Sequence, residues 1–344
     1  ILKSTNLNET IDFLSLHWDL PIWIVISLLF YYLWYKSEKD ITYNIAKIKI
    51  FSSGIAITLL ASYFINYSTE KNFYYEIKNR YYPISLMGVT KDYYDFQSLK
   101  ADALNKQDGF AFEAIHQKSE ETEIYILFLG ESARADHFGL NGYQPNTTPL
   151  LSSTNGVLNF EYAAAQASHT MRALPMILTR GTPENYNLTY QEKSIISAYK
   201  ESGFITSWIS SQPGYVFFDE EIYDDRRCYE ADFQKFCDKT NCDDIFLANE
   251  FAAQLKMVQT GEKYFFVLHG YGSHTPYENR YPSSYNLINN HSNPIINNYD
   301  NTILYTDFII KEVINSLESV DASCFLLYTS DHGENLADDS RNLY

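Results

Sequence analysis

Three residues whose side chains can bind a metal ion come directly after apolar runs of the chain. Glu131 follows one run, and the adjacent Asp331 and His332 follow another. Carboxylate and imidazole groups are zinc ligands, and neighbouring Asp and His side chains can reach the same ion. A lone Asp-His pair or a lone Glu is more often part of an ordinary turn, but these three all share a position after an apolar run. The sequence therefore predicts a zinc site.

A zinc ion with three protein ligands leaves a coordination position for a nucleophile, whose hydroxyl the ion would acidify. The candidates are Ser132, Ser168 and Thr170. Thr170 lies where a polar loop changes to an apolar helical pattern, so it can occupy the first turn of a helix. Free amides and the helix dipole there favour an alkoxide and an incoming phosphate. Ser168 or Thr170 could equally be a helix N-cap, and the residues alone leave the choice open.

These residues require a fold that brings distant segments together. From Glu123 onwards, apolar runs of strand length alternate with helical stretches; the runs are EIYILFLG ending at Gly130, FITSWIS from Phe204, KYFFVLH from Lys263 and SCFLLYTS ending at Ser330. This alternation predicts an α/β fold with a mostly parallel sheet and helices on both faces. Ligands bind beyond the carboxyl ends of such strands, where the zinc-binding residues, His269 and His274 are expected.

The first 67 residues are predicted to be a membrane region. Two apolar segments, at about 18–35 and 50–67, approach the length of about 20 residues that a transmembrane helix needs, although buried core helices would look similar. The short loop between them contains four lysines, which favours a cytoplasmic loop and export of everything after Tyr67. Residues 68–122 mix aromatic and charged side chains, as expected for either an interfacial bridging segment or a solvated linker.

Composition narrows the choice of partners and compartment. The chain has 344 residues and a formal net charge of −17, which would repel a phosphate backbone, so we expect no nucleic-acid binding. It reads as a fragment of a longer protein, with a catalytic domain from 123 to 344 that is truncated at its C-terminus. Cys237 and Cys242 enclose a short loop that suits a disulfide in an oxidising compartment, with a zinc site as the rival interpretation. Cys324 lies in an apolar run and is expected to be a buried thiol.

Four ordered motifs resemble the phosphoethanolamine transferases, a family that includes enzymes modifying lipid A. They are LGESARADHFGLNGYQPNTTPLL from Leu129, SHTMRALPMILTRGTPEN from Ser168, HGYGSHTPY from His269 and TSDHGENL from Thr329. The resemblance extends from about residue 55 to the end of the chain. It implies an alkaline-phosphatase-like catalytic domain preceded by transmembrane helices, in a bacterial inner membrane with the catalytic domain in the periplasm.

The resemblance also implies roles for individual residues. The zinc ligands of the family match Glu131, Asp331 and His332, and its threonine nucleophile, which also contacts the metal, matches Thr170. His274 matches a histidine that contacts the phosphate or a second metal. His269 and Gln212 match positions near the substrate, Gln212 by its likeness to enzymes acting on lipopolysaccharide core sugars. A core histidine is the alternative for His269.

The resemblance implies zinc-dependent transfer of phosphoethanolamine from phosphatidylethanolamine to lipid A or lipopolysaccharide core, through a covalent threonine intermediate. A phosphoglycerol transferase or a phosphatase-like hydrolase on the same fold is the nearest alternative. A sulfatase fits less well, because the Pro and Arg that follow a sulfatase nucleophile at fixed offsets do not follow Thr170. A membrane-tethered binding domain that has lost catalysis is the alternative that is not an enzyme.

Overall fold

The structure is a computed structural model that describes residues 109–117, 119–160, 162–212 and 244–336, together with a short strand at 227–228 and a few single residues. Almost all of these belong to a compact unit that spans Lys100–Tyr344. The predicted membrane segments at 18–35 and 50–67, most of the segment 68–122, and the predicted Cys237–Cys242 pair lie outside the described residues. Within the described part of the chain, no helix has the length and apolar character needed to cross a membrane.

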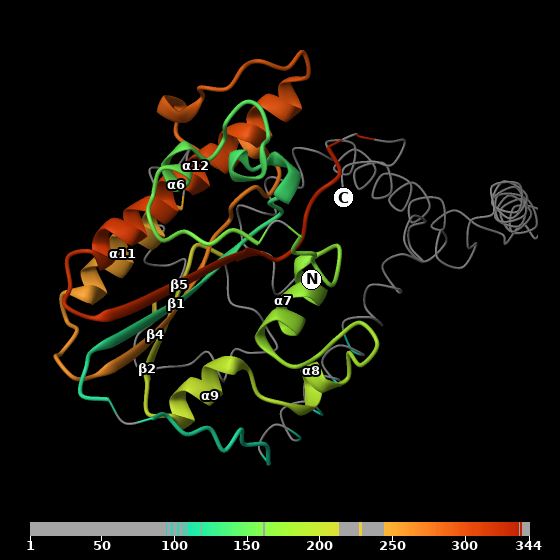
Figure 1. Ribbon diagram of the computed structural model, residues 1–344. Coiled ribbons are helices and arrows are strands. Elements are labelled where there is room, and N and C mark those ends of the chain that lie inside the picture. Colours follow the sequence, from blue (N-terminus) through green and yellow to red (C-terminus); the bar gives the residue numbers. More distant parts are fainter. Residues whose placement is uncertain are drawn as a thin grey trace, which may run out of the picture. The chain divides into compact units, whose positions relative to one another are not determined.

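A parallel five-stranded sheet forms the centre of this unit (Figure 1). Its strands are β1 (Glu123–Gly130), β2 (Ile205–Ser210), β3 (Arg227–Cys228), β4 (Lys263–His269) and β5 (Ser323–Ser330). They lie side by side in the order β3-β2-β4-β1-β5, and every neighbouring pair is parallel. The four apolar runs of the sequence are therefore confirmed as strands, and the short β3 is an addition that no apolar run indicates.

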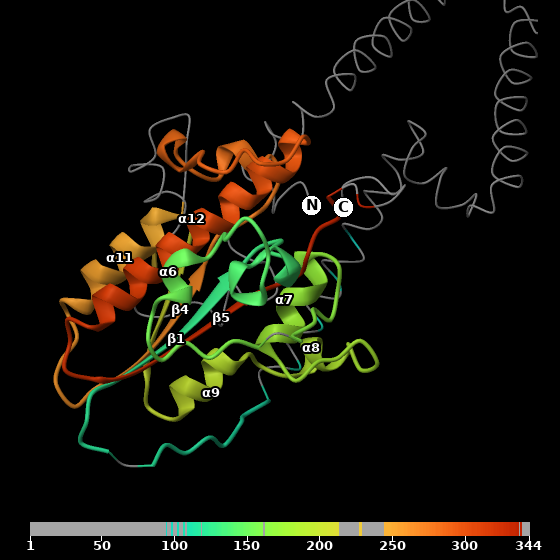
Figure 2. The same cartoon turned by 45° about the horizontal axis from the view of Figure 1, so that its top comes forward.

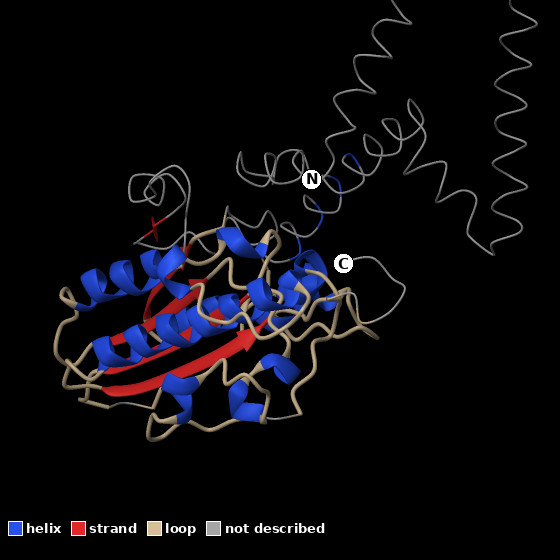
Figure 3. Ribbon diagram, turned by 90° about the horizontal axis from the view of Figure 1, so that it is seen from above, coloured by secondary structure: helices blue, strands red, loops and turns tan. Residues whose placement is uncertain are grey.

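Helices cover both faces of the sheet, as predicted for a buried parallel sheet (Figures 2 and 3). One face carries α6 (Pro149–Ser152), α11 (Ile245–Leu255) and α12 (Pro294–Leu317). The opposite side carries α8 (Leu188–Gln191) and α9 (Ile195–Glu201), with α7 (Thr170–Leu178) beside the carboxyl ends of the strands. Four short 3-10 helices lie in the connections, at Ala135–His137, Gly139–Asn141, Tyr277–Asn279 and Ser283–Tyr285.

The main core lies between the sheet and the pair α11 and α12. Alternate residues of β1, such as Ile126 and Phe128, pack there against Phe251 of α11 and Ile309 of α12. Helix α12 begins where its sequence favours a start, because Pro294 occupies the first turn and the Asn293 side chain accepts a hydrogen bond from the backbone N–H of Ile295 at 3.0 Å. Burial of these large side chains holds the strands of the sheet in fixed positions.

The expectation that Cys324 is a buried thiol is wrong, because Cys324 is exposed. It lies on β5, which pairs with β1 on one side and has no partner strand on its other side within the described residues. Its neighbours Phe325 and Leu327 are also 58% and 40% exposed. An apolar run predicts a strand equally well at the centre and at the edge of a sheet, so the sequence did not indicate how much of this strand is covered.

Candidate active site

The strands end level with one another at the edge of the sheet where the polar residues follow. Leu129 of β1 pairs with His269 of β4, His269 pairs with Ser210 of β2, and Gly130 pairs with Ser330 of β5. Because parallel strands point the same way, the residues directly after them meet at one edge. This register brings Glu131 close to Asp331 although they are far apart in the sequence.

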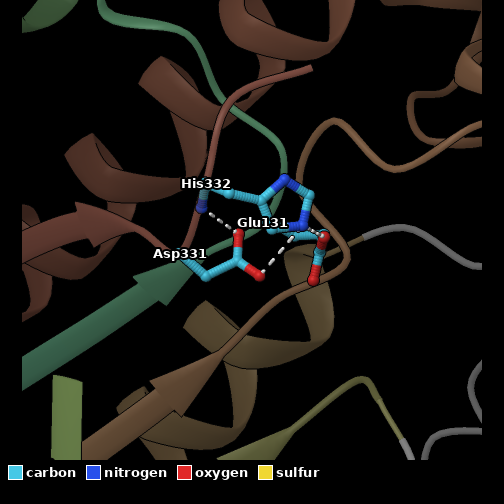
Figure 4. A group of neighbouring side chains, drawn as sticks. All are labelled: Glu131, Asp331 and His332. Atoms are coloured by element: carbon cyan, nitrogen blue, oxygen red, sulfur yellow. Dashed lines mark hydrogen bonds and ion pairs between the residues drawn. The ribbon is translucent and has the colours of Figure 1, made fainter. Parts of the chain in front are cut away.

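Glu131, Asp331 and His332 point toward one another beyond the ends of β1 and β5 (Figure 4). Each offers one ligand atom, and these atoms lie within 4.8 Å of one another. Nε2 of His332 is 3.2 Å from Oε1 of Glu131 and 3.4 Å from Oδ2 of Asp331. The predicted metal-binding group is therefore brought together.

The chemistry of this group fits a divalent cation. Glu131 is 1% exposed and Asp331 is 2% exposed, so two carboxylates are buried side by side. Buried carboxylates are costly unless a cation or hydrogen bonds compensate them. Oδ2 of Asp331 is buried and accepts no hydrogen bond from the described residues. Two carboxylates and one imidazole with a free position form a ligand set of the kind that catalytic zinc uses.

Without a metal ion, protons compensate part of this negative charge. Burial and the nearby charge of Glu131 raise the pKa of Asp331 above its usual range. Burial lowers the pKa of His332, but the hydrogen bond to Glu131 and the negative charges of Asp331 and Glu131 raise it to about 9. Burial would raise the pKa of Glu131, but His332 and His274 together lower it overall. A metal ion must therefore displace protons from His332 and Asp331.

We expect zinc binding to weaken as the pH falls. A ligand binds zinc only after it loses its proton, so affinity should fall by about tenfold per pH unit for each proton displaced between about pH 8 and pH 6. Chelator competition with the metal-free full-length protein measures this slope, and calorimetry in buffers of different ionisation enthalpy counts the protons released. A zinc affinity that is the same at both ends of this range would contradict the raised pKa of His332.

The Thr170 hydroxyl lies next to the metal-binding group. Thr170 is the first residue of α7, and its Oγ is 3.1 and 3.0 Å from the two carboxylate oxygens of Glu131 and 3.3 Å from Nε2 of His332. The predicted position at a helix N-terminus is confirmed. Free amides of the first turn and the helix dipole therefore lie close to this hydroxyl.

The other two hydroxyls are less well placed. Ser132 also lines the cavity, but it is 3% exposed and its hydroxyl donates to Oε1 of Glu131 at 3.0 Å. Ser168 lines the same cavity as Thr170, but it precedes α7 and, unlike Thr170, makes no hydrogen bond to the described metal-binding residues. Of the three hydroxyls, that of Thr170 has the geometry of a nucleophile.

A cavity of about 500 Å³ opens in front of this hydroxyl. Its wall includes Thr170, Glu131, His332 and the predicted site residue His274. Nδ1 of His274 is 2.6 Å from the carbonyl oxygen of Thr275, which can only accept, so Nδ1 carries the hydrogen. Nε2 of His274 is then the ring nitrogen that remains to contact a bound molecule.

His269 and Gln212 lie near Glu131 but are not among the residues that line the cavity. His269 is 1% exposed, and burial lowers its pKa to about 4 against the opposing charge of Glu131, which keeps the imidazole neutral. Its Nδ1 is 3.1 Å from Oγ of Ser210. Gln212 is 3% exposed and hydrogen-bonded to Glu131. The structure thus brings both residues to the site, behind the metal-binding carboxylate.

Sequence reasoning missed two residues that shape the cavity. His169 directly precedes Thr170 and lines the cavity wall. Its position next to the candidate nucleophile in the sequence could have indicated a place in the site. Arg134 also lines the cavity, and it joins the loop after β1 to the loop after β5, because its Nη1 donates to the carbonyl oxygen of Glu334 at 3.2 Å. Its Nε donates to Asp136 in its own loop at 2.9 Å. The position of Arg134 three residues after Glu131, within the first motif, could have indicated that it lies near the site.

The backbone around Glu131 is held from two sides. The Tyr299 hydroxyl, from α12, donates to the carbonyl oxygen of Ser132 at 2.6 Å and accepts from the N–H of Arg134 at 2.8 Å. Ser132 has a left-handed backbone with φ of 56°. On the other side Gly272, with φ of +46°, packs so closely that an added Cβ would lie 2.8 Å from the N and O atoms of Glu131. Such a contact requires glycine.

Residues 123–343 match the family model described as Sulfatase. The chain belongs to the sulfatase family. Its resemblance to phosphoethanolamine transferases is also confirmed, because Kdo(2)-lipid A phosphoethanolamine 7''-transferase of Escherichia coli strain K12 is 29% identical over 247 residues, covering 68% of this chain and 42% of that protein. The chain therefore spans less than half the length of this relative.

Solved structures share the fold of this chain. The C-terminal periplasmic domain of EcEptC from Escherichia coli, in complex with Zn, has a TM-score of 0.56 and 24% sequence identity, with 64% of this chain and 67% of that chain covered. The integral membrane protein lipooligosaccharide phosphoethanolamine transferase A from Neisseria meningitidis has a TM-score of 0.63 and 20% identity, with 87% of this chain and 59% of that chain covered. Because the two structures are only 24% and 20% identical to this chain, they show that the fold is shared and nothing further about its function.

Proposed function

We propose that the full-length protein is a zinc-dependent phosphoethanolamine transferase. The observation that carries this proposal is the Thr170 hydroxyl, which lies 3.0 Å from a carboxylate oxygen of Glu131 within a buried metal-binding group. The similarity to a lipid A phosphoethanolamine transferase supports the choice of transferred group. Phosphatidylethanolamine is the proposed donor, and lipid A or lipopolysaccharide core is the proposed acceptor.

Glu131, Asp331 and His332 would hold one zinc ion, with Thr170 as the fourth contact. When bound, zinc supplies positive charge that acidifies the hydroxyl and neutralises phosphoryl oxygens. The solved EcEptC domain that contains Zn supports the choice of metal. A second metal near His274 remains part of the proposal, because His274 lines the same cavity.

The reaction proceeds in two displacements at phosphorus. In the first, Oγ of Thr170 attacks the phosphate of phosphatidylethanolamine and the bond to the diacylglycerol oxygen breaks. Nε2 of His274 takes the Thr170 proton and passes it to the departing oxygen. In the second, a hydroxyl or phosphate oxygen of the acceptor attacks the phosphoethanolamine on Thr170. A hydroxyl acceptor passes its proton through His274 to the departing Thr170 oxygen, whereas with an ionised phosphate acceptor this oxygen takes its proton from water; either route restores the free enzyme.

We propose that the protein is anchored in a bacterial inner membrane with this domain in the periplasm. The apolar segments at 18–35 and 50–67 and the lysines between them support this topology. The structural relatives include a periplasmic domain and an integral membrane protein, which agrees with that arrangement. Both proposed substrates are membrane lipids, so an anchored enzyme would meet them at the membrane surface.

Lipid analysis of cells with and without the full-length gene tests the proposed function. Mass spectrometry should find a phosphoethanolamine increment on lipid A or lipopolysaccharide core only when the gene is present and Thr170 is intact. A phosphoglycerol increment would identify the alternative transferase, and free ethanolamine phosphate without a modified glycolipid would identify a hydrolase. Protease added to spheroplasts of the same cells should digest the catalytic domain, and complete protection would contradict the periplasmic location.

A further inference from the structure

Gln212 reaches across the end of the sheet to the metal-binding carboxylate. It lies two residues beyond β2, and β4 lies between β2 and β1 in the sheet. Ser210, His269 and Leu129 are level with one another at the ends of these three strands. The Gln212 side chain therefore passes the end of β4 before it meets Glu131 at the end of β1.

The side-chain amide of Gln212 makes two hydrogen bonds that define its orientation. Nε2 donates to the carbonyl oxygen of Gly270 at 2.7 Å and to Oε2 of Glu131 at 3.2 Å. Both partners can only accept when Glu131 is ionised, so the NH₂ group and not the oxygen must face them. The backbone N–H of Gln212 also donates to Oγ of Ser210 at 3.0 Å, which fixes the base of the side chain.

Gln212 differs from the other groups that contact the Glu131 carboxylate. Thr170 and His332 also lie close to this carboxylate, but both are themselves proposed contacts of the zinc ion. If both contact a bound metal, the Gln212 amide and the Ser132 hydroxyl are the hydrogen-bond donors left to the carboxylate among the residues that the structure describes. Hydrogen bonds to ligating carboxylates orient them and tune metal affinity.

We propose that Gln212 is a positioning residue that orients Glu131 for zinc binding, and not a substrate-binding residue. This inference rests on the proposed zinc site. The amide donates a hydrogen bond to the charged form of Glu131 and adds no charge of its own to the site. It also ties the loop after β4 to the loop after β1, because one amide holds both Gly270 and Glu131. Loss of its two donors should leave the carboxylate free to turn away from the metal.

Chelator competition with the full-length protein tests this role. Gln212→Met keeps the approximate length of the side chain without its donors, and we expect zinc affinity to fall on the order of 10-fold to 100-fold. Gln212→Glu places a second carboxylate against Glu131 and should weaken zinc binding further. Transfer activity of Gln212→Met should recover when zinc is added in excess, with little change in the KM for phosphatidylethanolamine.

Gln254 provides a matched control. It is 2% exposed, and its Nε2 donates to Oε1 of Glu250 at 3.1 Å on α11, away from the metal-binding group. Gln254→Met should lower the melting temperature by an amount comparable to Gln212→Met and leave zinc affinity within about twofold, because it removes a buried donor outside the site.

Three results would overturn the inference. The first is an unchanged zinc affinity in Gln212→Met. The second is an equal loss of zinc affinity in Gln254→Met. The third is a raised KM for phosphatidylethanolamine in Gln212→Met with normal zinc affinity, which would make Gln212 a substrate-binding residue. Failure of the proposed function has a different signature, because the unchanged protein would then bind no zinc or transfer no phosphoethanolamine.

Discussion

Thr170→Ala should abolish phosphoethanolamine transfer by the full-length enzyme, with a loss of at least about 10³-fold in kcat. The substitution removes the oxygen that lies 3.0 Å from Glu131 and 3.3 Å from His332. Thr170 is partly exposed at the start of α7, and loss of its methyl and hydroxyl should cost about 1 kcal/mol of folding free energy. An assay of transfer from labelled phosphatidylethanolamine, together with a thermal melt, measures both effects.

Two further variants distinguish the nucleophile from a residue that only shapes the site. Thr170→Ser keeps the hydroxyl and should retain measurable transfer. Ser168→Ala removes another hydroxyl from the same cavity wall and should retain most activity. Full transfer by Thr170→Ala, or an equal loss in Ser168→Ala, would show that the nucleophile lies elsewhere. Ser132→Ala should also retain most activity, but the hydrogen bond from Ser132 to Glu131 makes Ser168 the cleaner control.

Asp331→Ala should remove tight zinc binding and transfer together. Asp331 is one of the three proposed protein ligands, so its loss should weaken zinc affinity by more than about 100-fold. This is more than the loss expected when a ligand only loses a hydrogen-bond partner. Oδ1 of Asp331 also accepts from the backbone N–H groups of Ser132 at 3.1 Å and His332 at 2.7 Å. Asp331→Asn keeps an acceptor for these amides while it removes the charge, so it should keep the local fold and still bind zinc poorly.

Asp307→Asn is the matched control for Asp331. Asp307, on α12, is 1% exposed and accepts from the N–H groups of Leu150 and Leu151 of α6 at 2.9 Å each, and it is not one of the metal-binding residues. Its substitution should lower stability and leave one zinc per protein by elemental analysis. Stoichiometric tight zinc in Asp331→Ala, or its loss in Asp307→Asn, would remove the basis for the site.

The sequence predicted the fold well where burial dictates the pattern. Strands β1 and β4 are buried on both faces, so each appears as a nearly continuous apolar run that ends at a polar residue. Helix α12 shows a helical spacing of apolar residues because one side packs on the sheet. Since parallel strands end at one edge, Glu131, Asp331 and His332 could be grouped before any contact was known.

The sequence could not predict where individual side chains point. Gln212 and His269 were predicted to lie near the substrate, with a core histidine as the alternative for His269. Their directions depend on the register of β2 and β4, and neither is among the residues that line the cavity. The contact made by Tyr299 was also missed, because its hydroxyl reaches the loop after β1 from the second turn of α12. Cys324 was misplaced for a different reason, since an apolar run does not reveal whether its strand lies at an edge.

The central claim is that the Thr170 hydroxyl of a zinc-containing enzyme carries the phosphoethanolamine group between donor and acceptor. The most direct test is intact-protein and peptide mass spectrometry of the full-length enzyme after incubation with phosphatidylethanolamine and no acceptor. The proposed reaction predicts one phosphoethanolamine adduct on Thr170, which disappears when the acceptor glycolipid is added. An adduct on Ser132, Ser168 or any other residue, or transfer without any adduct on a trapped enzyme, would contradict it.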